Sequence, residues 1–163
     1  MLNKTAMDLN IFLDELTLQM PILFNQKNQK LILAIEKQLP QVEADRDRLE
    51  QIIFNLITNA IKYSPARSEI ALRVKPTNGR VVFEVEDSAP IIATGEAERL
   101  FDPYYRGQDT VEQEHLPGLG LGLYLVKKLV ELHDGEIWLK SLPGKGNVFA
   151  FSLKVADIPT TEE

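Results

Sequence analysis

Apolar residues recur every three or four positions along residues 47–64, which predicts an amphipathic helix with one face committed to a core. The same spacing follows three alternating glycines, where Leu123, Val126 and Leu129 predict a second helix. Residues 7–24 are expected to form another helix near the start of the chain. Helices therefore alternate along the chain with segments of a different pattern.

The segments between these helices predict strands that pair as hairpins. Apolar and β-branched residues flank an Asn78-Gly79 turn signal, and a Gly-rich stretch at 143–147 marks a second turn. Hairpins interrupted by long helices predict an α+β two-layer sandwich with a mixed, mostly antiparallel sheet and helices on one face. A doubly wound nucleotide-binding fold fits this order less well. The expected strands are residues 30–37, a short piece around Val42, 69–75, 80–86, 136–141 and 148–155.

Gly118, Gly120 and Gly122 alternate immediately before the predicted helix that contains Leu123. A helix N-terminus carries unpaired N–H groups and the positive end of the peptide dipoles, so bare backbone here can approach an anion closely. The pattern predicts a phosphate chain and hence a nucleotide. Glycines at these intervals also occur in flexible turns and tight packing contacts, so alone they leave both interpretations open.

The polar face of the helix over residues 47–64 carries Asn55, Asn59 and Lys62, which are four and three residues apart. An Asn carbonyl oxygen can bind a Mg²⁺ ion that takes its other ligands from phosphates and water, and a Lys can neutralise a phosphate. Two Asn on a solvated helix face can also lack any function. Because Asn is a poor helix former, a pair one turn apart favours metal-nucleotide binding.

Composition narrows the possible classes of function. With 163 residues and 44% hydrophobic content, the chain is long enough for one globular domain with a sizeable core. A net charge of −6 without a basic stripe argues against nucleic-acid binding. The lack of cysteine excludes disulfides and thiolate metal sites, and the apolar runs are too short for a membrane span or a signal peptide. A cytoplasmic location is expected.

Motifs in four ordered segments resemble those of one family. Residues 47–65 resemble the N box of sensor histidine kinases, 98–107 the F box, 118–123 the second glycine box and 144–146 the short last glycine motif. The resemblance covers about residues 8–155 and implies that the chain is the catalytic ATP-binding domain of such a kinase. It also implies the ATPase fold shared with DNA gyrase and the large heat-shock chaperone.

The resemblance assigns the adenine end of the site. Asp87 occupies the place of the family Asp that accepts a hydrogen bond from the adenine amino group. A carboxylate only accepts, so it favours this donor over the carbonyl of guanine. Tyr63 is expected to stack against adenine. A strand-end Asp that merely begins a turn is the alternative that the residue alone would allow.

The phosphate end follows from the same resemblance. Asn59 is expected to bind Mg²⁺, while Asn55, Lys62 and Arg106 are implied as catalytic residues that also contact ATP. Residues 102–117 are implied to form a lid, from which Arg106 meets the γ-phosphate. The backbone that faces the phosphates is expected at Gly118, Leu119, Gly120, Leu121, Gly122 and Leu123.

The family implies a reaction with two partners in two-component signal transduction. The ATP-binding domain donates the γ-phosphate to a His on an upstream dimerisation domain, from which the phosphate passes to a response regulator. We therefore expect residues 7–157 to be the catalytic domain, 1–6 the end of an upstream helical region and 158–163 a flexible tail. Neither His115 nor His133 lies in a phosphoacceptor-like sequence, and His133 is expected to cap a helix. The isolated domain is expected to be a monomer and the full-length protein a homodimer.

The first glycine box departs from the family pattern. Asp87 is followed by Ser88-Ala89-Pro90-Ile91, so both expected glycines are absent. If either position needs a left-handed backbone, the side chain costs about 1–2 kcal/mol, or the loop takes another path. Leu119 also replaces a small hydroxyl residue, and weak ATP affinity is therefore predicted. A pseudokinase that senses nucleotide or only binds proteins, and an anti-sigma-type serine kinase, are the alternatives.

Overall fold

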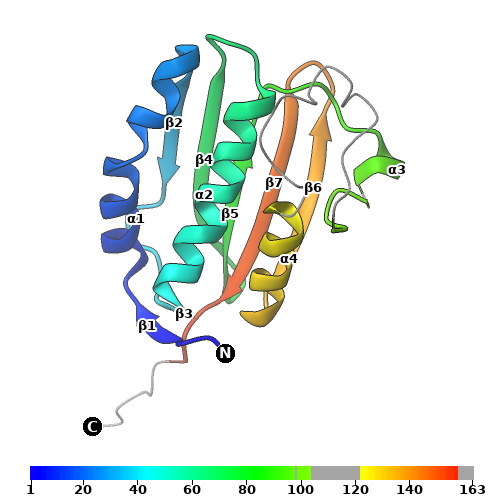
Figure 1. Cartoon of the computed structure of the whole chain (residues 1–163). Coiled ribbons are helices and arrows are strands. Elements are labelled where there is room, and N and C mark those ends of the chain that lie inside the picture. Colours follow the sequence, from blue (N-terminus) through cyan, green and yellow to red (C-terminus); the bar gives the residue numbers. More distant parts are fainter. Residues whose placement is uncertain (98, 104–121, 158–163) are drawn as a thin grey trace, which may run out of the picture.

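The structure is a computed structural model that describes residues 1–97, 99–103 and 122–157. Helices cover one face of a five-stranded sheet, and a small two-stranded sheet lies at one end (Figure 1). The elements in chain order are β1 (Thr5–Met7), α1 (Leu9–Leu18), the 3-10 helix η1 (Pro21–Lys27), β2 (Lys30–Ile35), β3 (Val42–Ala44), α2 (Arg46–Tyr63), β4 (Glu69–Thr77), β5 (Arg80–Glu86), α3 (Thr94–Ala97), α4 (Gly122–Leu132), β6 (Glu136–Leu142) and β7 (Gly146–Lys154).

The main sheet has the order β2-β4-β5-β7-β6. Only the β2–β4 pair is parallel, and the other neighbours are antiparallel. Figure 1 shows α1, α2 and α4 side by side on the same face. The predicted α+β sandwich, with a mixed, mostly antiparallel sheet and helices on one face, is confirmed.

The core lies between α2, α4 and the sheet. The apolar stripe of α2 is fully buried there, as predicted from its spacing, and a side chain of this size contributes about 1.5–3 kcal/mol when it is removed from water. Phe83 of β5 stacks on Phe151 of β7, with ring centroids 4.6 Å apart. The buried residues of the stripe are Leu49, Ile52, Ile53, Leu56, Ile57 and Ala60.

The first predicted hairpin is confirmed and is longer than expected. Asn78 and Gly79 both have positive φ, 41° and 77°, which suits a two-residue turn between β4 and β5. Pairing therefore continues to Thr77 opposite Arg80. The second hairpin, β6–β7, is confirmed as well.

The predicted helix over residues 7–24 is wrong at both ends. The Asp8 side chain accepts a hydrogen bond from the N–H of Ile11 at 3.1 Å and so caps α1 at its start. The helix ends at Leu18, and Pro21, which has no N–H to donate, begins the 3-10 helix η1 instead.

Thr5 and Ala6 also differ from the expectation of an upstream helical region for residues 1–6. They belong to β1, which pairs with β3 in antiparallel register, and this strand was not predicted. Because only three residues form it, the strand had no periodic signal in the sequence.

The described helices do not resemble membrane spans. The longest, α2, has 18 residues and carries a polar face. Within residues 1–97, 99–103 and 122–157, no helix is both long enough and apolar enough to cross a bilayer.

The C-terminal end of α2 is held by a lysine from η1. Nζ of Lys27 donates to the carbonyl oxygens of Ile61, Lys62 and Ser64 at 2.9, 2.8 and 3.1 Å. These carbonyls lie at the end of the helix, where the helix dipole is negative and partners within the helix are missing. The ammonium group therefore both caps and neutralises this end.

We expect Lys27→Met to lower the free energy of unfolding by about 2 kcal/mol, because the charged hydrogen bonds are lost while the aliphatic stem is kept. Lys37→Met removes an exposed lysine and is the matched control, with an expected change below about 0.5 kcal/mol. Urea unfolding followed by circular dichroism measures both. Equal effects of the two substitutions would show that Lys27 does not stabilise this helix end.

Candidate functional site

The polar face of α2 brings together the side chains singled out in the sequence. Asn55, Asn59, Lys62 and Tyr63 are all half-buried residues of α2, and none of them belongs to its buried apolar stripe. The predicted spacing on one helix face is confirmed. Their proposed contacts with metal, phosphate and adenine stay predictions.

Asp87 follows the last residue of β5 and is 3% exposed. Its Oδ1 accepts hydrogen bonds from the N–H of Ala89 at 3.0 Å and from both the N–H and the Nδ2 of Asn147 at 3.0 and 3.3 Å. Burial raises the pKa of this carboxyl, and these hydrogen bonds oppose the rise only in part. Within the described ranges Oδ2 accepts no hydrogen bond.

A direct hydrogen bond joins α2 to the segment after Asp87. The N–H of Ser88 donates to Oγ of Ser64, the residue that follows α2, at 3.0 Å. Figure 1 shows the end of α2, the end of β5 and the β6–β7 turn at the same end of the molecule. A buried carboxylate therefore lies beside the end of the helix that carries two amides and a cation.

The segment that lacks the family glycines is not strained. Among the described residues, positive φ outside glycine occurs only at Asn28, Arg67, Asn78 and Asp134, so neither Ala89 nor Ile91 has a left-handed backbone. The expected cost of about 1–2 kcal/mol for a side chain in a left-handed backbone is therefore absent.

The side chain of Asn147 holds the segment after Asp87 by hydrogen bonds, and this role was not predicted from the sequence. It is fully buried, and its Nδ2 donates to the carbonyl oxygen of Pro90 at 3.0 Å, while its Oδ1 accepts from the N–H of Ile92 at 3.2 Å and from Oγ of Ser141 at 2.8 Å. The same side chain therefore fixes Asp87 and the loop after it. The only signal in the sequence was its place directly after Gly146 in the last glycine motif.

Gly146 packs directly against the backbone of Asp87. Its φ is +148°, and a Cβ added here would overlap the carbonyl oxygen of Asp87. Glycine is required because both the conformation and the close backbone approach exclude a side chain. The last glycine motif thus acts through Asp87, whereas a Cβ on Gly122, at the start of α4, would meet no described atom within 4 Å.

Only the end of the second glycine box can be placed. Gly122 begins α4, and the partly buried Leu123 side chain packs against the core. The other predicted residues of the lid and the glycine box lie outside the described residues: Arg106, Gly118, Leu119, Gly120 and Leu121.

Phe101 and His133 make structural contacts, and for His133 a structural role was predicted. Phe101 is buried and meets Phe149 edge to face, with centroids 6.3 Å apart. His133 Nδ1 lies 2.7 Å from the carbonyl oxygen of Leu129, and Nε2 accepts from the N–H of Asp45 at 3.1 Å. Because both ring nitrogens are engaged, this His ties the end of α4 to the start of α2. His115 lies outside the described residues.

Among the described residues, His, Cys, Asp and Glu side chains do not gather into a metal centre. Within the described part of the chain, no cluster of three or more His, Cys, Asp or Glu could hold a metal ion. A cation at the polar face of α2 would therefore depend on Asn oxygens together with oxygens from a ligand, which is the coordination that Mg²⁺ accepts.

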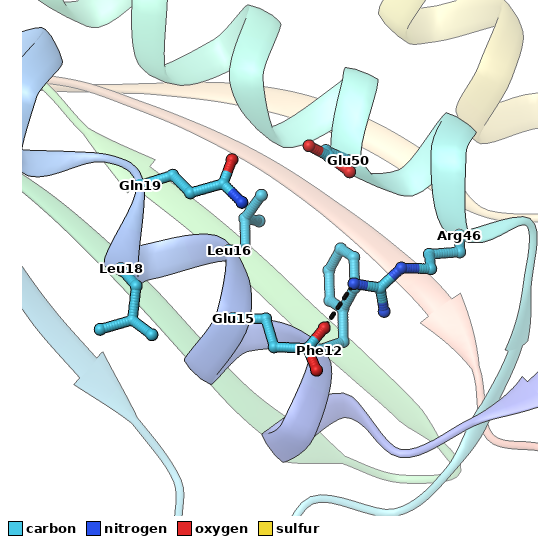
Figure 2. A pocket seen from close by; sticks show the side chains of 7 residues that line it. All are labelled: Phe12, Glu15, Leu16, Leu18, Gln19, Arg46 and Glu50. Carbon is cyan, nitrogen blue, oxygen red and sulfur yellow. Dashed lines mark hydrogen bonds and ion pairs between the residues drawn. The ribbon is translucent and has the colours of Figure 1, made fainter.

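A groove of about 430 Å³ between α1 and α2 is separate from these residues. Figure 2 shows Arg46 of α2 reaching across it, paired with Glu15 and lying over the ring of Phe12 at 5.3 Å. None of the predicted site residues lines this groove.

Comparison with known proteins gives a consistent result. Residues 44–157 match the family model of histidine kinase-, DNA gyrase B- and HSP90-like ATPases. The chain is 40% identical over 134 residues to the adaptive-response sensory kinase SasA of Crocosphaera subtropica, a match that covers 82% of this chain and 34% of that protein. The chain therefore spans about a third of the length of the curated relatives that it matches.

Solved structures show the same similarity. The catalytic domain of histidine kinase ThkA superposes with a TM-score of 0.81 at 26% identity, over 94% of this chain and 97% of that one. Full-length ShkA, solved in complex with AMPPNP, gives 0.79 at 27% identity, over 98% of this chain and 33% of that one. ThkA in complex with the response regulator TrrA gives 0.78 at 26% identity, over 94% and 42% of the two chains.

Proposed function

The chain belongs to the family of histidine kinase-, DNA gyrase B- and HSP90-like ATPases, as an ATPase domain of the sensor histidine kinase type, and from this premise we propose that it binds Mg-ATP and donates the γ-phosphate to a phosphoacceptor His on an upstream dimerisation domain. The phosphate would then pass to the receiver domain of a response regulator. The ThkA–TrrA complex, which pairs a kinase of this fold with a response regulator, supports that second partner.

The observation that carries the proposal is that the Asp87 carboxylate is buried and accepts hydrogen bonds at Oδ1. A buried carboxylate costs free energy unless something compensates it, and its Oδ1 is already saturated by Ala89 and Asn147. An exocyclic amino group of adenine would donate to Oδ2 and so compensate the charge. A purine carbonyl at that position would face a carboxylate oxygen instead, so the site would favour adenine over guanine.

The phosphate end of the proposal rests on α2. Asn59 would supply an oxygen to Mg²⁺ with Asn55 beside it, Lys62 would lie against the phosphates, and Tyr63 would stack on adenine. Bound Mg²⁺ would neutralise charge on the β- and γ-phosphates. Arg106 and the backbone of residues 118–123 are proposed to complete the phosphate contacts.

Weak ATP affinity stays a prediction, but only one of its two grounds remains. The part that rested on strain at Ala89 and Ile91 has no support, because both residues have ordinary backbone conformations. The substitution of Leu119 for a hydroxyl residue is what continues to favour it. A nucleotide-sensing module without phosphotransfer is the second candidate.

We expect Asn59→Ala to weaken binding of a non-hydrolysable ATP analogue about tenfold in Mg²⁺ and to leave binding without Mg²⁺ unchanged, because only a metal ligand is lost. Calorimetric titration of the chain with and without Mg²⁺ measures this, and Asn25→Ala, an exposed Asn of η1, is the control. Equal losses of affinity with and without Mg²⁺ would contradict the assignment of Asn59 as a metal ligand. Phosphotransfer to the His of the full-length protein then separates a kinase from a nucleotide sensor.

A further inference from the structure

β2 is an open edge of the main sheet. It pairs with β4 on one side, and no strand of the described residues pairs with its other side. The register from Lys30 opposite Glu69 to Ile35 opposite Val74 runs one to one, so no bulge bends the strand away, and it contains no proline. Bulges and prolines are two of the means by which proteins block an exposed edge.

The free hydrogen-bonding groups of this edge can be assigned. The N–H of Lys30 donates to Ser68 and that of Glu36 donates to Val74, both at 3.0 Å. Because alternate residues of a parallel pair face the same neighbour, the even-numbered residues between them also face β4. The N–H and C=O groups of residues 31, 33 and 35 therefore point outward.

The edge is also apolar. Ile32 and Leu33 are 42% and 46% exposed, and the strand carries a charge only at Lys30, its first residue. The opposite edge strand, β6, differs because it contains both Glu136 and Lys140. Five of the nine exposed large apolar side chains among the described residues belong to α1, η1 and β2, which lie together at one side of Figure 1: Ile11, Leu18, Ile22, Ile32 and Leu33.

We propose that β2 pairs in antiparallel register with β2 of a second copy of this chain, with Leu33 facing Leu33 across a twofold axis. In this register residues 31, 33 and 35 face residues 35, 33 and 31 of the second copy, so the outward groups match. Lys30 then lies opposite Glu36 of the second copy at both ends of the pair, and Ile32 lies opposite Ala34.

This self-complementarity selects a second copy over an unrelated strand. Opposite charges directly across an antiparallel pair are favourable and like charges are unfavourable, so a shifted register loses both pairs. Lys30 and Glu36 are exposed and form no ion pair among the described residues, so both are available. The interface is short, and we expect a weak dimer in place of the monomer expected from the sequence.

Sedimentation velocity over a range of concentrations tests the proposal with the whole chain. Lys30→Glu alone and Glu36→Lys alone should each weaken dimerisation about tenfold, since each places like charges opposite one another at both ends. An equimolar mixture of the two variants should form heterodimers about as strong as the wild-type dimer, because opposite charges then meet at both ends. This recovery depends on the register and would not follow from a change in net charge.

Leu33→Pro provides the second variant. It removes an N–H that faces outward, so the pairing with β4 should survive, as circular dichroism can verify, while dimerisation is lost. A chain that stays monomeric up to about millimolar concentration would overturn the proposal and leave the edge to an extended segment of another protein. A dimer that is unaffected by Leu33→Pro, or two charge variants that do not recover on mixing, would equally overturn it.

Discussion

Asp87→Asn is expected to weaken binding of an ATP analogue by about a hundredfold or more, while the protein stays folded and at least as stable at neutral pH. Asn keeps an oxygen that can accept the bonds from Ala89 and Asn147, which hold Oδ1 at present. It places an NH₂ group where Oδ2 lies, so two donors would oppose each other at the adenine amino group. The loss of a charged hydrogen bond together with this opposition amounts to about 3 kcal/mol.

The stability part of this prediction depends on pH. Burial raises the pKa of the Asp87 carboxyl above its ordinary value of 3.8, so the folded chain binds this proton more tightly than the unfolded chain. Ionised Asp87 therefore lowers the free energy of unfolding at neutral pH, and this penalty disappears as the pH falls through the raised pKa. The stability difference between wild type and Asp87→Asn should shrink over the same range.

Calorimetric titration and urea unfolding at several pH values measure the two effects. Asp14→Asn, an exposed residue of α1, is the matched control and should change neither. A variant that unfolds more easily than wild type at neutral pH would show that ionised Asp87 is a structural requirement of the fold. Unchanged affinity would remove Asp87 from the adenine site.

Gly146→Ala is expected to abolish binding of the ATP analogue and to lower the free energy of unfolding by about 3 kcal/mol or more. Its φ of +148° is nearly restricted to glycine, and the added Cβ would overlap the backbone of Asp87. Relief of this overlap requires β7 to separate from the end of β5. The hydrogen bonds of Asn147 to Asp87 are lost with that separation.

Gly95→Ala is the control, because a Cβ at this position would meet no described atom within 4 Å and its φ is not positive. Urea unfolding and titration of both variants separate a general cost of replacing glycine from the specific contact with Asp87. Normal affinity in Gly146→Ala would mean that Asp87 can move without loss of the site, which would contradict the support assigned to the last glycine motif.

Regular elements were largely predictable from the sequence because their signals are local. The stripe of α2 places the helix at residues 46–63, against 47–64 expected, since the apolar spacing itself creates the buried face. The Asn78-Gly79 pair gave the first hairpin because only a few residue types adopt positive φ at both turn positions. The first helix was misjudged because its apolar pattern continues past Pro21, although a proline interrupts the helical hydrogen bonds there.

The candidate site was predictable only in part. The residues on the face of α2 share one element, so their spacing was sufficient to group them. Asn147 and Asp87 are 60 positions apart and meet only because β7 pairs with β5. The same pairing brings Asn147 to the loop through Pro90 and Ile92, where its side chain forms hydrogen bonds. A sequence motif does not contain this contact.

The sequence by itself determined the periodic elements, the hairpin turns, the family resemblance and the set of polar residues with suitable chemistry, because each depends on neighbours along the chain. The tertiary structure alone decided which of those groups lose their water and which partners compensate them. Asp87 has a raised pKa and a single open oxygen because distant strands bury it and Asn147 occupies the other oxygen. Desolvation and hydrogen-bond saturation are properties of surroundings in space, and strand pairing across the sheet creates those surroundings.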